Sequence, residues 1–418
     1  MKALISKSSI SGRAAAPPSK SYTIRALICA ALAQGESLVR NPLKSDDTAA
    51  ATSVLARVGA RIAEDKTDWR VTGGVLKPSA EALFCRESAA TLRFMTAISA
   101  VIPGITRLTF GPSLARRPIQ PLLDILSELG VACRLESDAV VVEGKRLLGG
   151  TVKVIHDVSS QYISALLFAA VLMENGLVIE LAAPPRSQPY IQMTIECLRQ
   201  FGIRVTSAPD LTQIRITPQS YLPSTYQVEG DWSQASYLLA LGATSGEVLV
   251  TNLNAESLQG DRAIINILQK MGTRFSQRGG SVMVSPSPLR AISVDMANTI
   301  DLLPTVAVLA AMADGESELR GIANARLKES NRVLALCEEL GKMGIRVIEG
   351  EDTLKITGDR PQGAVIDGRA DHRLAMAFAV LGASVGNVTI LGAECVDKTF
   401  PDFWRVFRSL GGHVELSD

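Results

Sequence analysis

The hydrophobic pattern of this chain recurs six times at nearly equal intervals. In each repeat an Ala- and Leu-rich stretch ends at a glycine, and β-branched residues follow it in alternation. A glycine just past a helix adopts the left-handed conformation that ends the helix, and the alternating residues after it begin a strand. These evenly spaced glycines are Gly35, Gly104, Gly176, Gly246, Gly315 and Gly386.

A second glycine series runs in phase with the first and has the same period. Its members are Gly59, Gly130, Gly202, Gly272, Gly344 and Gly411. Each repeat is therefore predicted to contain a helix, a strand, a second helix, a second strand and a further strand, as in 132–144. Chance recurrence of glycine is the alternative, and two in-phase series across the whole chain argue against it.

Six repeats allow either one closed ring or two groups of three. The length of 418 residues favours two globular halves, because single cores rarely grow to that size. The sequence EGD at 229–231 opens the fourth repeat, so a division near these residues is expected.

Composition removes several classes of function. Lys plus Arg number 43 and Asp plus Glu 42, so no overall basic field favours nucleic acid. The 6 cysteines form no CxxC pair and the chain has only 3 histidines, so neither a disulfide framework nor a metal site is expected. The N-terminus lacks a signal-peptide core and the apolar runs are short, which predicts a cytoplasmic protein without membrane spans. Neither a Walker loop nor a GxGxxG after a first strand is present.

Polar residues gather before the predicted helices. Helix capping explains Ser, Thr and Asp there, and Asp47, Asp231 and Asp261 are the clearest expected caps. The segments before the first helix of each repeat are 19–21, 88–93, 159–161, 231–233, 301 and 371–373. Those before the second helix are 46–47, 116–118, 187–190, 260–261, 328–330 and 398–401.

Capping does not explain the cations at these positions. A cation near a helix N-terminus is repelled by the helix dipole by about 0.3–1 kcal/mol, and a bound anion offsets this. If the repeats point the same way, the cations of both halves face one cleft for a ligand with several negative charges. They are Lys20, Arg25, Arg93, Arg117, Lys328, Arg332, Arg373 and Lys398.

Two carboxylates lie in this cationic setting without being needed for anion binding. Asp301 and Glu329 are therefore candidates for proton transfer. For Glu329 a structural ion pair with Arg332 is an equally open interpretation.

These motifs resemble those of the 5-enolpyruvylshikimate-3-phosphate synthases, a family of enolpyruvyl transferases. The matching segments are 18–25 (PSKSYTIR), 88–93 (SAATLR), 117–118 (RP), 159–161 (SSQ), 328–332 (KESNR), 371–373 (DHR) and 398–401 (KTFP). They occur in order from residue 17 to 402, and the ordered set is far more specific than any one of them.

The resemblance implies an α/β (α+β) fold of two domains, each of three βαβαββ repeats, of the inside-out α/β barrel or β-prism type. It implies one domain from 1–19 and 230–418 and a second from 20–229. It also implies transfer of the enolpyruvyl group of phosphoenolpyruvate to the 5-hydroxyl of shikimate 3-phosphate, with release of phosphate, in aromatic amino acid biosynthesis. Neither a cofactor nor a metal is implied. The expected partners are the two small substrates and not nucleic acid, and the protein is expected to be a monomer.

The resemblance carries the following residue roles. The catalytic residues are Asp301, Glu329, Lys20 and Lys398. Shikimate 3-phosphate is held by Lys20, Ser21, Arg25, Ser159, Ser160, Gln161, Ser187, Tyr190, Asp301, Asn324 and Lys328. Phosphoenolpyruvate is held by Lys20, Ala89, Arg117, Gln161, Arg332, Arg373 and Lys398.

Three residues depart from the family pattern. Pro18 replaces a glycine, so the backbone is stiffer there and lacks one N–H donor. Asn331 replaces an aspartate beside Arg332 and leaves the orientation of that arginine open. Ala89 stands where glycine is usual, and its methyl group is expected to weaken inhibition by glyphosate, which occupies that site in the family.

Two alternative functions fit the sequence less well. The related transferase acting on UDP-N-acetylglucosamine carries a loop cysteine, whereas 113–117 has none and Cys85 is expected to be buried or inert. A catalytically inactive anion-binding protein is disfavoured because Asp301, Glu329 and Lys398 occur together.

Overall fold

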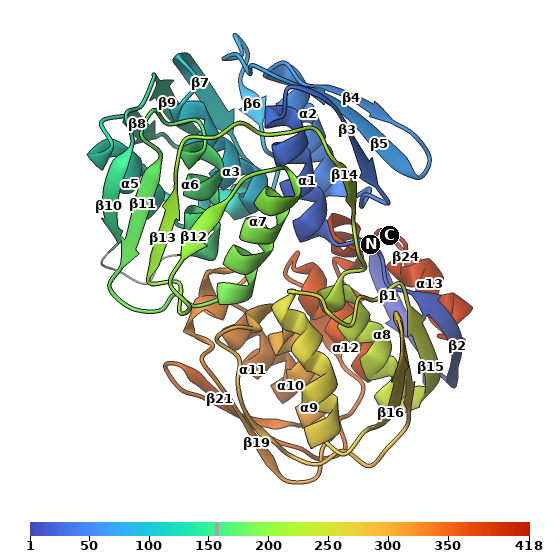
Figure 1. Cartoon of the computed structure of the whole chain (residues 1–418). Helices are drawn as coiled ribbons and strands as arrows, with labels where there is room; N and C mark the ends of the chain where they lie inside the picture. The colour runs from blue at the N-terminus through green and yellow to red at the C-terminus, as the bar shows by residue number, and fades with distance from the viewer. Residues whose placement is uncertain (155–158) are drawn as a thin grey trace. The chain divides into compact units, whose positions relative to one another are not determined.

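The computed structural model describes residues 1–154 and 159–418 (Figure 1). Its internal contacts divide the chain into two compact units. Unit 1 combines Met1–Pro17 with Glu229–Asp418, and unit 2 is the continuous segment Pro18–Val228. Each unit is a set of three repeats with its own core, and each is described by itself.

One repeat of unit 2 shows the common topology. Strand β10 (Gly150–Val154) runs parallel to β11 (Leu177–Leu181), with α6 (Ser160–Ala170) between them in sequence. After α7 (Gln188–Gln200), the hairpin of β12 (Val205–Ser207) and β13 (Gln213–Ile216) places β13 antiparallel to β11. The sheet order is β10-β11-β13-β12, which is a βαβαββ unit.

The other repeats of unit 2 form sheets β6-β7-β9-β8 and β14-β3-β5-β4. The first contains β6 (Leu83–Phe84), α3 (Ala89–Ala100), β7 (Gly104–Thr109), α4 (Pro112–Ala115), α5 (Gln120–Glu128), β8 (Ala132–Leu135) and β9 (Ala139–Gly144). The second contains α1 (Lys20–Leu32), β3 (Gly35–Arg40), α2 (Asp46–Arg57), β4 (Arg61–Glu64), β5 (Asp68–Gly73) and β14 (Thr225–Gln227). Its outer strand β14 comes from the end of the unit and pairs in parallel with β3.

Unit 1 forms sheets β2-β15-β17-β16, β18-β19-β21-β20 and β22-β23-β1-β24. The first contains β2 (Ile10–Ala15), α8 (Trp232–Ser245), β15 (Gly246–Thr251), η1 (Gly260–Ala263), α9 (Ile264–Lys270), β16 (Arg274–Arg278) and β17 (Ser281–Ser285). The second contains β18 (Ser293–Asp295), η2 (Ile300–Leu302), α10 (Leu303–Ala311), β19 (Glu316–Arg320), η3 (Ala323–Leu327), α11 (Arg332–Lys342), β20 (Arg346–Glu349) and β21 (Thr353–Thr357). The third contains β1 (Lys2–Ile5), β22 (Val365–Asp367), α12 (His372–Val385), β23 (Val388–Leu391), η4 (Ala393–Lys398), α13 (Phe403–Ser409) and β24 (Val414–Ser417).

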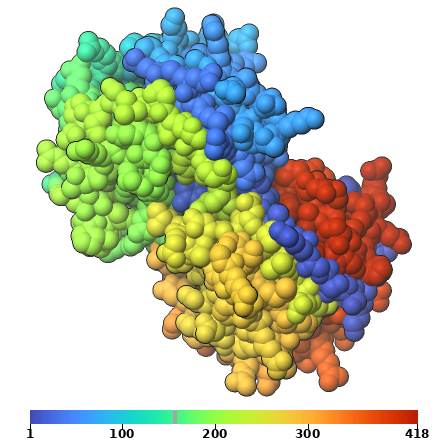
Figure 2. Space-filling model, turned by 45° about the vertical axis from the view of Figure 1, so that its right-hand side comes forward, coloured from blue at the N-terminus to red at the C-terminus, as the bar shows by residue number. Residues whose placement is uncertain are grey.

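The N-terminal segment completes two sheets of unit 1. β1 pairs antiparallel with both β23 and β24, and β2 pairs in parallel with β15. Figure 2 shows the blue N-terminal segment beside the red C-terminal segment. In the described residues all six sheets share one strand order, so the predicted two-domain fold of βαβαββ repeats is confirmed.

The two glycine series have the backbone conformation that the sequence predicts. All twelve glycines have φ between +70° and +156°, where residues with a Cβ atom are strained. The repeating glycines therefore mark changes from helix to strand.

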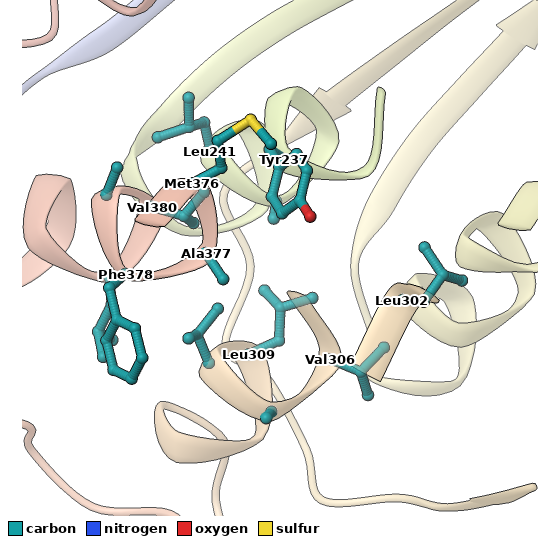
Figure 3. Close-up of a cluster of buried hydrophobic side chains, with 14 of the residues drawn as sticks. Tyr237, Leu241, Leu302, Val306, Leu309, Met376, Ala377, Phe378 and Val380 are labelled. Carbon is teal, nitrogen blue, oxygen red and sulfur yellow. The ribbon is translucent and has the colours of Figure 1, made fainter. Parts of the chain in front are cut away.

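The first helices of the repeats form the centre of each core. In unit 1, α8, α10 and α12 pack against one another and are almost entirely buried. Figure 3 shows Tyr237 and Leu241 of α8 near Met376 of α12, with Val306 and Leu309 of α10 on the same cluster. These helices are apolar around nearly their whole circumference because they are buried on nearly all sides. Their packing fixes the positions of the polar residues at their N-terminal ends. In the part of the chain that the structure describes, we find no helix with the length and apolar character to cross a membrane.

Candidate active site

Arg332 is the centre of a charged cluster in unit 1. It is the first residue of α11, and its side chain is 0% exposed. Its Nε lies 2.8 Å from Asp371 Oδ2, and its Nη1 lies 2.8 Å from Asp301 Oδ1. Its Nη2 donates to Glu329 Oε2 at 2.7 Å and to Asp371 Oδ1 at 3.2 Å. Burial acts to lower the pKa of Arg332, but the three carboxylates raise it, so the guanidinium stays charged.

Further cations surround two of these carboxylates. Asp301 has Lys328 Nζ at 3.4 Å and Arg373 Nη2 at 3.3 Å, while Lys398 Nζ lies 3.8 Å from Glu329 Oε1. Burial acts to raise the pKa of Asp301, but Arg373, Lys328 and Arg332 hold it well below its usual range. Thus the residues predicted for unit 1 form one connected network, with the exception of Asn324.

Asn324 lies in η3, shortly before Lys328 in sequence. Within the described residues no hydrogen bond joins it to the charged network.

Two helix caps lie beside Arg332. Asn331 caps α11, its Oδ1 accepting from Leu334 N at 3.1 Å. Asp371 caps α12 by accepting from Arg373 N at 3.0 Å, and it also accepts from Ser330 Oγ at 3.0 Å. The replacement of aspartate by Asn331 therefore keeps the cap, and the carboxylates fix the arginine.

Two of the three expected caps are wrong. Asp231 does cap α8, accepting from Gln234 N at 3.1 Å. Asp47 does not cap α2, because Ser45 occupies that position and Asp47 instead accepts from Lys20 Nζ at 3.0 Å. Asp261 accepts from Ser233 Oγ of α8. In both cases the carboxylate accepts from a donor on a neighbouring element and not from its own helix.

In unit 2, Arg25 joins two helices. Its Nε donates to Thr194 Oγ1 at 2.8 Å and its Nη2 to Tyr190 O at 3.1 Å, both on α7. Its guanidinium lies 5.4 Å from the centre of the Phe94 ring and 5.9 Å from that of Tyr190. Burial lowers the pKa of Arg25, and the side chain is 2% exposed. Arg25 and Tyr190 thus support each other directly.

Arg93, which was predicted only as one of the cations near the helix starts, also binds a predicted site residue. Its Nη1 donates to Gln161 Oε1 at 2.7 Å and its Nη2 to Pro118 O at 2.9 Å. Its guanidinium lies 5.0 Å from the centre of the Tyr162 ring. The SAATLR motif could have predicted this role of Arg93, because an arginine buried in such a segment needs hydrogen-bond acceptors.

The remaining predicted residues of unit 2 lie near helix starts. Lys20 and Ser21 begin α1, and Ala89 begins α3 and is 5% exposed. Ser159 caps α6 by accepting from Gln161 N at 3.3 Å, and Ser160 is the first residue of that helix. Ser187 precedes α7 with a left-handed φ of 56°, and Arg117 lies between α4 and α5. Helix α7 packs against both α1 and α6, and α3 packs against α6.

The remaining expectations concern Cys85, the histidines and metal-ligating side chains. Cys85 is 0% exposed, so the expectation of a buried cysteine is confirmed, and burial raises the pKa of its thiol, which disfavours the reactive thiolate. His413 is exposed, and His156 lies outside the described residues. Among residues 1–154 and 159–418, no three His, Cys, Asp or Glu side chains are grouped to hold a metal ion.

Solved structures identify the class of fold. EPSP synthase from Acinetobacter baumannii superimposes with a TM-score of 0.84 at 25% identity, covering 100% of both chains. The enolpyruvyl transferase NikO from Streptomyces tendae superimposes with a TM-score of 0.81 at 18% identity, covering 99% of this chain and 98% of that one. The architecture is that of the enolpyruvyl transferases.

Sequence comparison identifies the family within that class. A family profile described as EPSP synthase (3-phosphoshikimate 1-carboxyvinyltransferase) matches residues 5–407. A 3-phosphoshikimate 1-carboxyvinyltransferase of Dehalococcoides mccartyi is 48% identical over 416 residues, covering 99% of each chain. One from Halobacterium salinarum is 41% identical over 430 residues, covering 99% of this chain and 100% of its own. The chain belongs to the EPSP synthase family.

Proposed function

We propose that this chain transfers the enolpyruvyl group of phosphoenolpyruvate to the 5-hydroxyl of shikimate 3-phosphate, releasing phosphate. Membership of the EPSP synthase family supports this reaction. The structural observation that carries it is the network in which Arg332 binds both Glu329 and Asp301 among further cations. Such a site combines proton-transfer groups with stabilisation of developing negative charge.

The chemistry requires one proton donor and one proton acceptor. Glu329, beside Lys398, protonates the methylene carbon of phosphoenolpyruvate, which makes C2 electrophilic. Asp301 orients the attacking 5-hydroxyl or takes its proton, with Lys20 assisting. The carboxylate of Glu329 then takes a proton from the methyl group as the C2–O bond to phosphate breaks. This step forms the enol ether, returns the proton to Glu329 and releases phosphate, which carries away the proton of the 5-hydroxyl.

The substrate contacts divide by charge. Ser21, Ser159, Ser160 and Ser187 hold the phosphate of shikimate 3-phosphate, since hydroxyls at helix starts suit an anion. The rest of that substrate contacts Lys20, Arg25, Gln161, Tyr190, Asp301, Asn324 and Lys328. Phosphoenolpyruvate contacts Lys20, Ala89, Arg117, Gln161, Arg332, Arg373 and Lys398.

Arg332 has a role besides substrate binding, which is to hold the proposed proton donor and acceptor. Its contacts with Asp371, Asp301 and Glu329 use four of its five N–H groups. We assign it first to holding the acid and the base in place, and its remaining Nη1 N–H to phosphoenolpyruvate.

We also propose that the protein is a cytoplasmic monomer. The free state of all 6 cysteines agrees with a reducing compartment.

Phosphate release tests the reaction. Mixing the protein with phosphoenolpyruvate and shikimate 3-phosphate should release phosphate stoichiometrically with the enol ether product. Replacing shikimate 3-phosphate by UDP-N-acetylglucosamine should give no release. Release only with the sugar nucleotide would support the related transferase, and no release with either would support a binding protein.

Substitution of Glu329 tests the proposed proton donor. Glu329→Gln keeps hydrogen-bonding capacity but cannot donate an acidic proton, so phosphate release should slow by about 10²–10⁴-fold while both substrates still bind. Single-turnover phosphate release and calorimetric titration measure these two properties. Glu338→Gln is the matched control, because Glu338 is exposed and pairs with Arg369 outside the network. Unchanged turnover in Glu329→Gln would remove Glu329 from this role.

A further inference from the structure

Glu87 joins two segments of unit 2 to which the proposed function assigns phosphoenolpyruvate contacts. It directly precedes the N-cap of α3 and lies two residues before Ala89 in sequence. Its carboxylate accepts from two successive backbone N–H groups of the segment 111–117, which contains α4. Glu87 Oε1 lies 3.2 Å from Ser113 N, and Oε2 lies 2.7 Å from Leu114 N. Because hydrogen bonds to a carboxylate are stronger than those between neutral groups, Glu87 holds this segment firmly.

Gly111 leaves the room that the Glu87 side chain occupies. A Cβ atom at Gly111 would lie 2.2 Å from Glu87 Oε1 and 2.7 Å from its Cδ, and the three nearest heavy atoms outside the adjacent residues all belong to Glu87. The backbone of Gly111 has φ −83° and ψ 171°, an extended conformation that any residue adopts. The close approach of the carboxylate, and not the backbone conformation, therefore requires a glycine at this position.

Backbone hydrogen bonds extend this contact to Arg117. Gly111 N donates to Arg86 O at 2.9 Å, so the first residue of the segment is also held beside Glu87. At the other end of α4, Arg117 N donates to Leu114 O at 3.0 Å. This bond places Arg117 one turn after Leu114, the residue that Glu87 binds. The position of Arg117 relative to the start of α3 is thus set through Glu87.

A second group of contacts holds the backbone on the other side of Arg117. The carbonyl oxygen of Pro118, the next residue, accepts from Arg93 Nη2 at 2.9 Å and from the hydroxyl of Tyr162. Arg93 lies on α3 and Tyr162 lies on α6. Glu87 and Arg93 therefore attach both sides of Arg117 to the first part of α3, one before the helix and one within it.

We propose that Glu87 is a positioning residue that sets Arg117 against the start of α3 and thereby determines how tightly phosphoenolpyruvate binds. This inference rests on the proposed function, in which Arg117 and Ala89 contact that substrate. Glu87 acts through the backbone of 111–117 and transfers no proton. A carboxylate that acted only as a nearby charge would repel the anionic substrate, so its removal would tighten binding. Loss of the positioning contact weakens binding instead.

Gly111→Ala tests the contact without removing the charge. The added Cβ atom displaces the Glu87 carboxylate, so KM for phosphoenolpyruvate should rise by roughly tenfold, while KM for shikimate 3-phosphate stays within about twofold of wild type. Glu87→Ala should give the same pattern. Initial rates of phosphate release, with each substrate varied in turn, measure both constants. Glu143→Ala is the matched control and should change neither, because Glu143 is exposed and pairs with Arg134 in the hairpin of the same repeat.

The double variant Glu87→Ala/Gly111→Ala shows whether both changes act through one contact. Without the Glu87 side chain the added Cβ atom loses its nearest neighbours, so KM for phosphoenolpyruvate should be within about twofold of that of Glu87→Ala alone.

Three results would overturn the proposal: multiplied effects in the double variant, equal changes in both KM values, or an unchanged or lower KM for phosphoenolpyruvate in Glu87→Ala. If Glu87→Ala does not fold, Gly111→Ala decides the outcome by the same comparison of the two KM values. Failure of the proposed function is distinct, because wild type would then release no phosphate with shikimate 3-phosphate.

Discussion

Three aspartates at equivalent positions of the repeats show how neighbours determine the role of a residue. Asp231, Asp301 and Asp371 are evenly spaced along the chain, one in each repeat of unit 1. Asp231 caps its helix, Asp301 binds Arg373 and Arg332, and Asp371 caps α12 while also holding Arg332. Each repeat of unit 1 thus has an aspartate at the same position, but the cations that surround the aspartate differ from repeat to repeat.

Ala89 is the residue at which we predict altered inhibitor sensitivity. It begins α3, and in the family pattern a glycine lies there beside phosphoenolpyruvate. The methyl group should narrow the space that glyphosate occupies, so Ala89→Gly should lower the inhibition constant for glyphosate by roughly tenfold, equivalent to about 1.4 kcal/mol. Inhibition titrations at fixed phosphoenolpyruvate concentration measure this.

Ala90→Gly is the control for Ala89→Gly. It makes the same chemical change one residue further into α3, at a cost in stability of up to about 1 kcal/mol, and should leave the inhibition constant within about twofold of wild type. Ordinary glyphosate sensitivity in wild type, or an equal gain in both variants, would contradict the assigned position of Ala89.

At the scale of elements, the glycine at the end of α8 is predicted to be indispensable. Gly246 has φ +156°, and a Cβ atom there would lie 1.6 Å from Ile10 O, on the strand that pairs with β15. Gly246→Ala must therefore displace β2, at a cost of roughly 4 kcal/mol or more. Chemical denaturation followed by fluorescence measures the loss.

Gly344→Ala is the matched comparison for Gly246→Ala. Gly344 also has positive φ, +83°, but a Cβ atom there meets nothing within 4 Å. Only backbone strain of about 1–2 kcal/mol is expected. Equal losses in the two variants would show that close approach to β2 is not what requires Gly246.

The elements were predictable because their signals are local, whereas their partners were not. Each glycine of the two series marks the end of a helix that lies close to it in sequence. All twelve glycines have the positive φ that this position requires. The pairing of β14 with β3 joins strands near opposite ends of the segment Pro18–Val228, and no local pattern encodes it. The same limit applied to Asp47 and Asp261, whose caps were inferred from position while their actual donors, Lys20 and Ser233, lie on other elements.

At the scale of the whole molecule, the last repeat is completed by the first strand. In five sheets of the described residues the last two strands of the repeat are consecutive hairpins: β4–β5, β8–β9, β12–β13, β16–β17 and β20–β21. In the sixth, β24 and β1 occupy these places and pair antiparallel, with Ser417 opposite Lys2. The chain termini thus lie where the other sheets have a short loop.

This topology predicts which fragments of the chain fold. Unit 2 is one continuous segment, so 18–228 should fold alone. The segment 229–418 lacks β1 and β2 and leaves two sheets with unpaired edges and exposed core residues, so it should not.

Joining Asp418 to Met1 by about four residues, the usual length of a hairpin loop, should restore unit 1 as 229–418 followed by 1–17. Cooperative thermal unfolding measured by circular dichroism separates these cases. Cooperative unfolding of 229–418 alone would show that the N-terminal strands are dispensable. Failure of the permuted chain, with 18–228 folding normally, would show that unit 1 depends on more than its own strands, because the permutation preserves every strand pair within it.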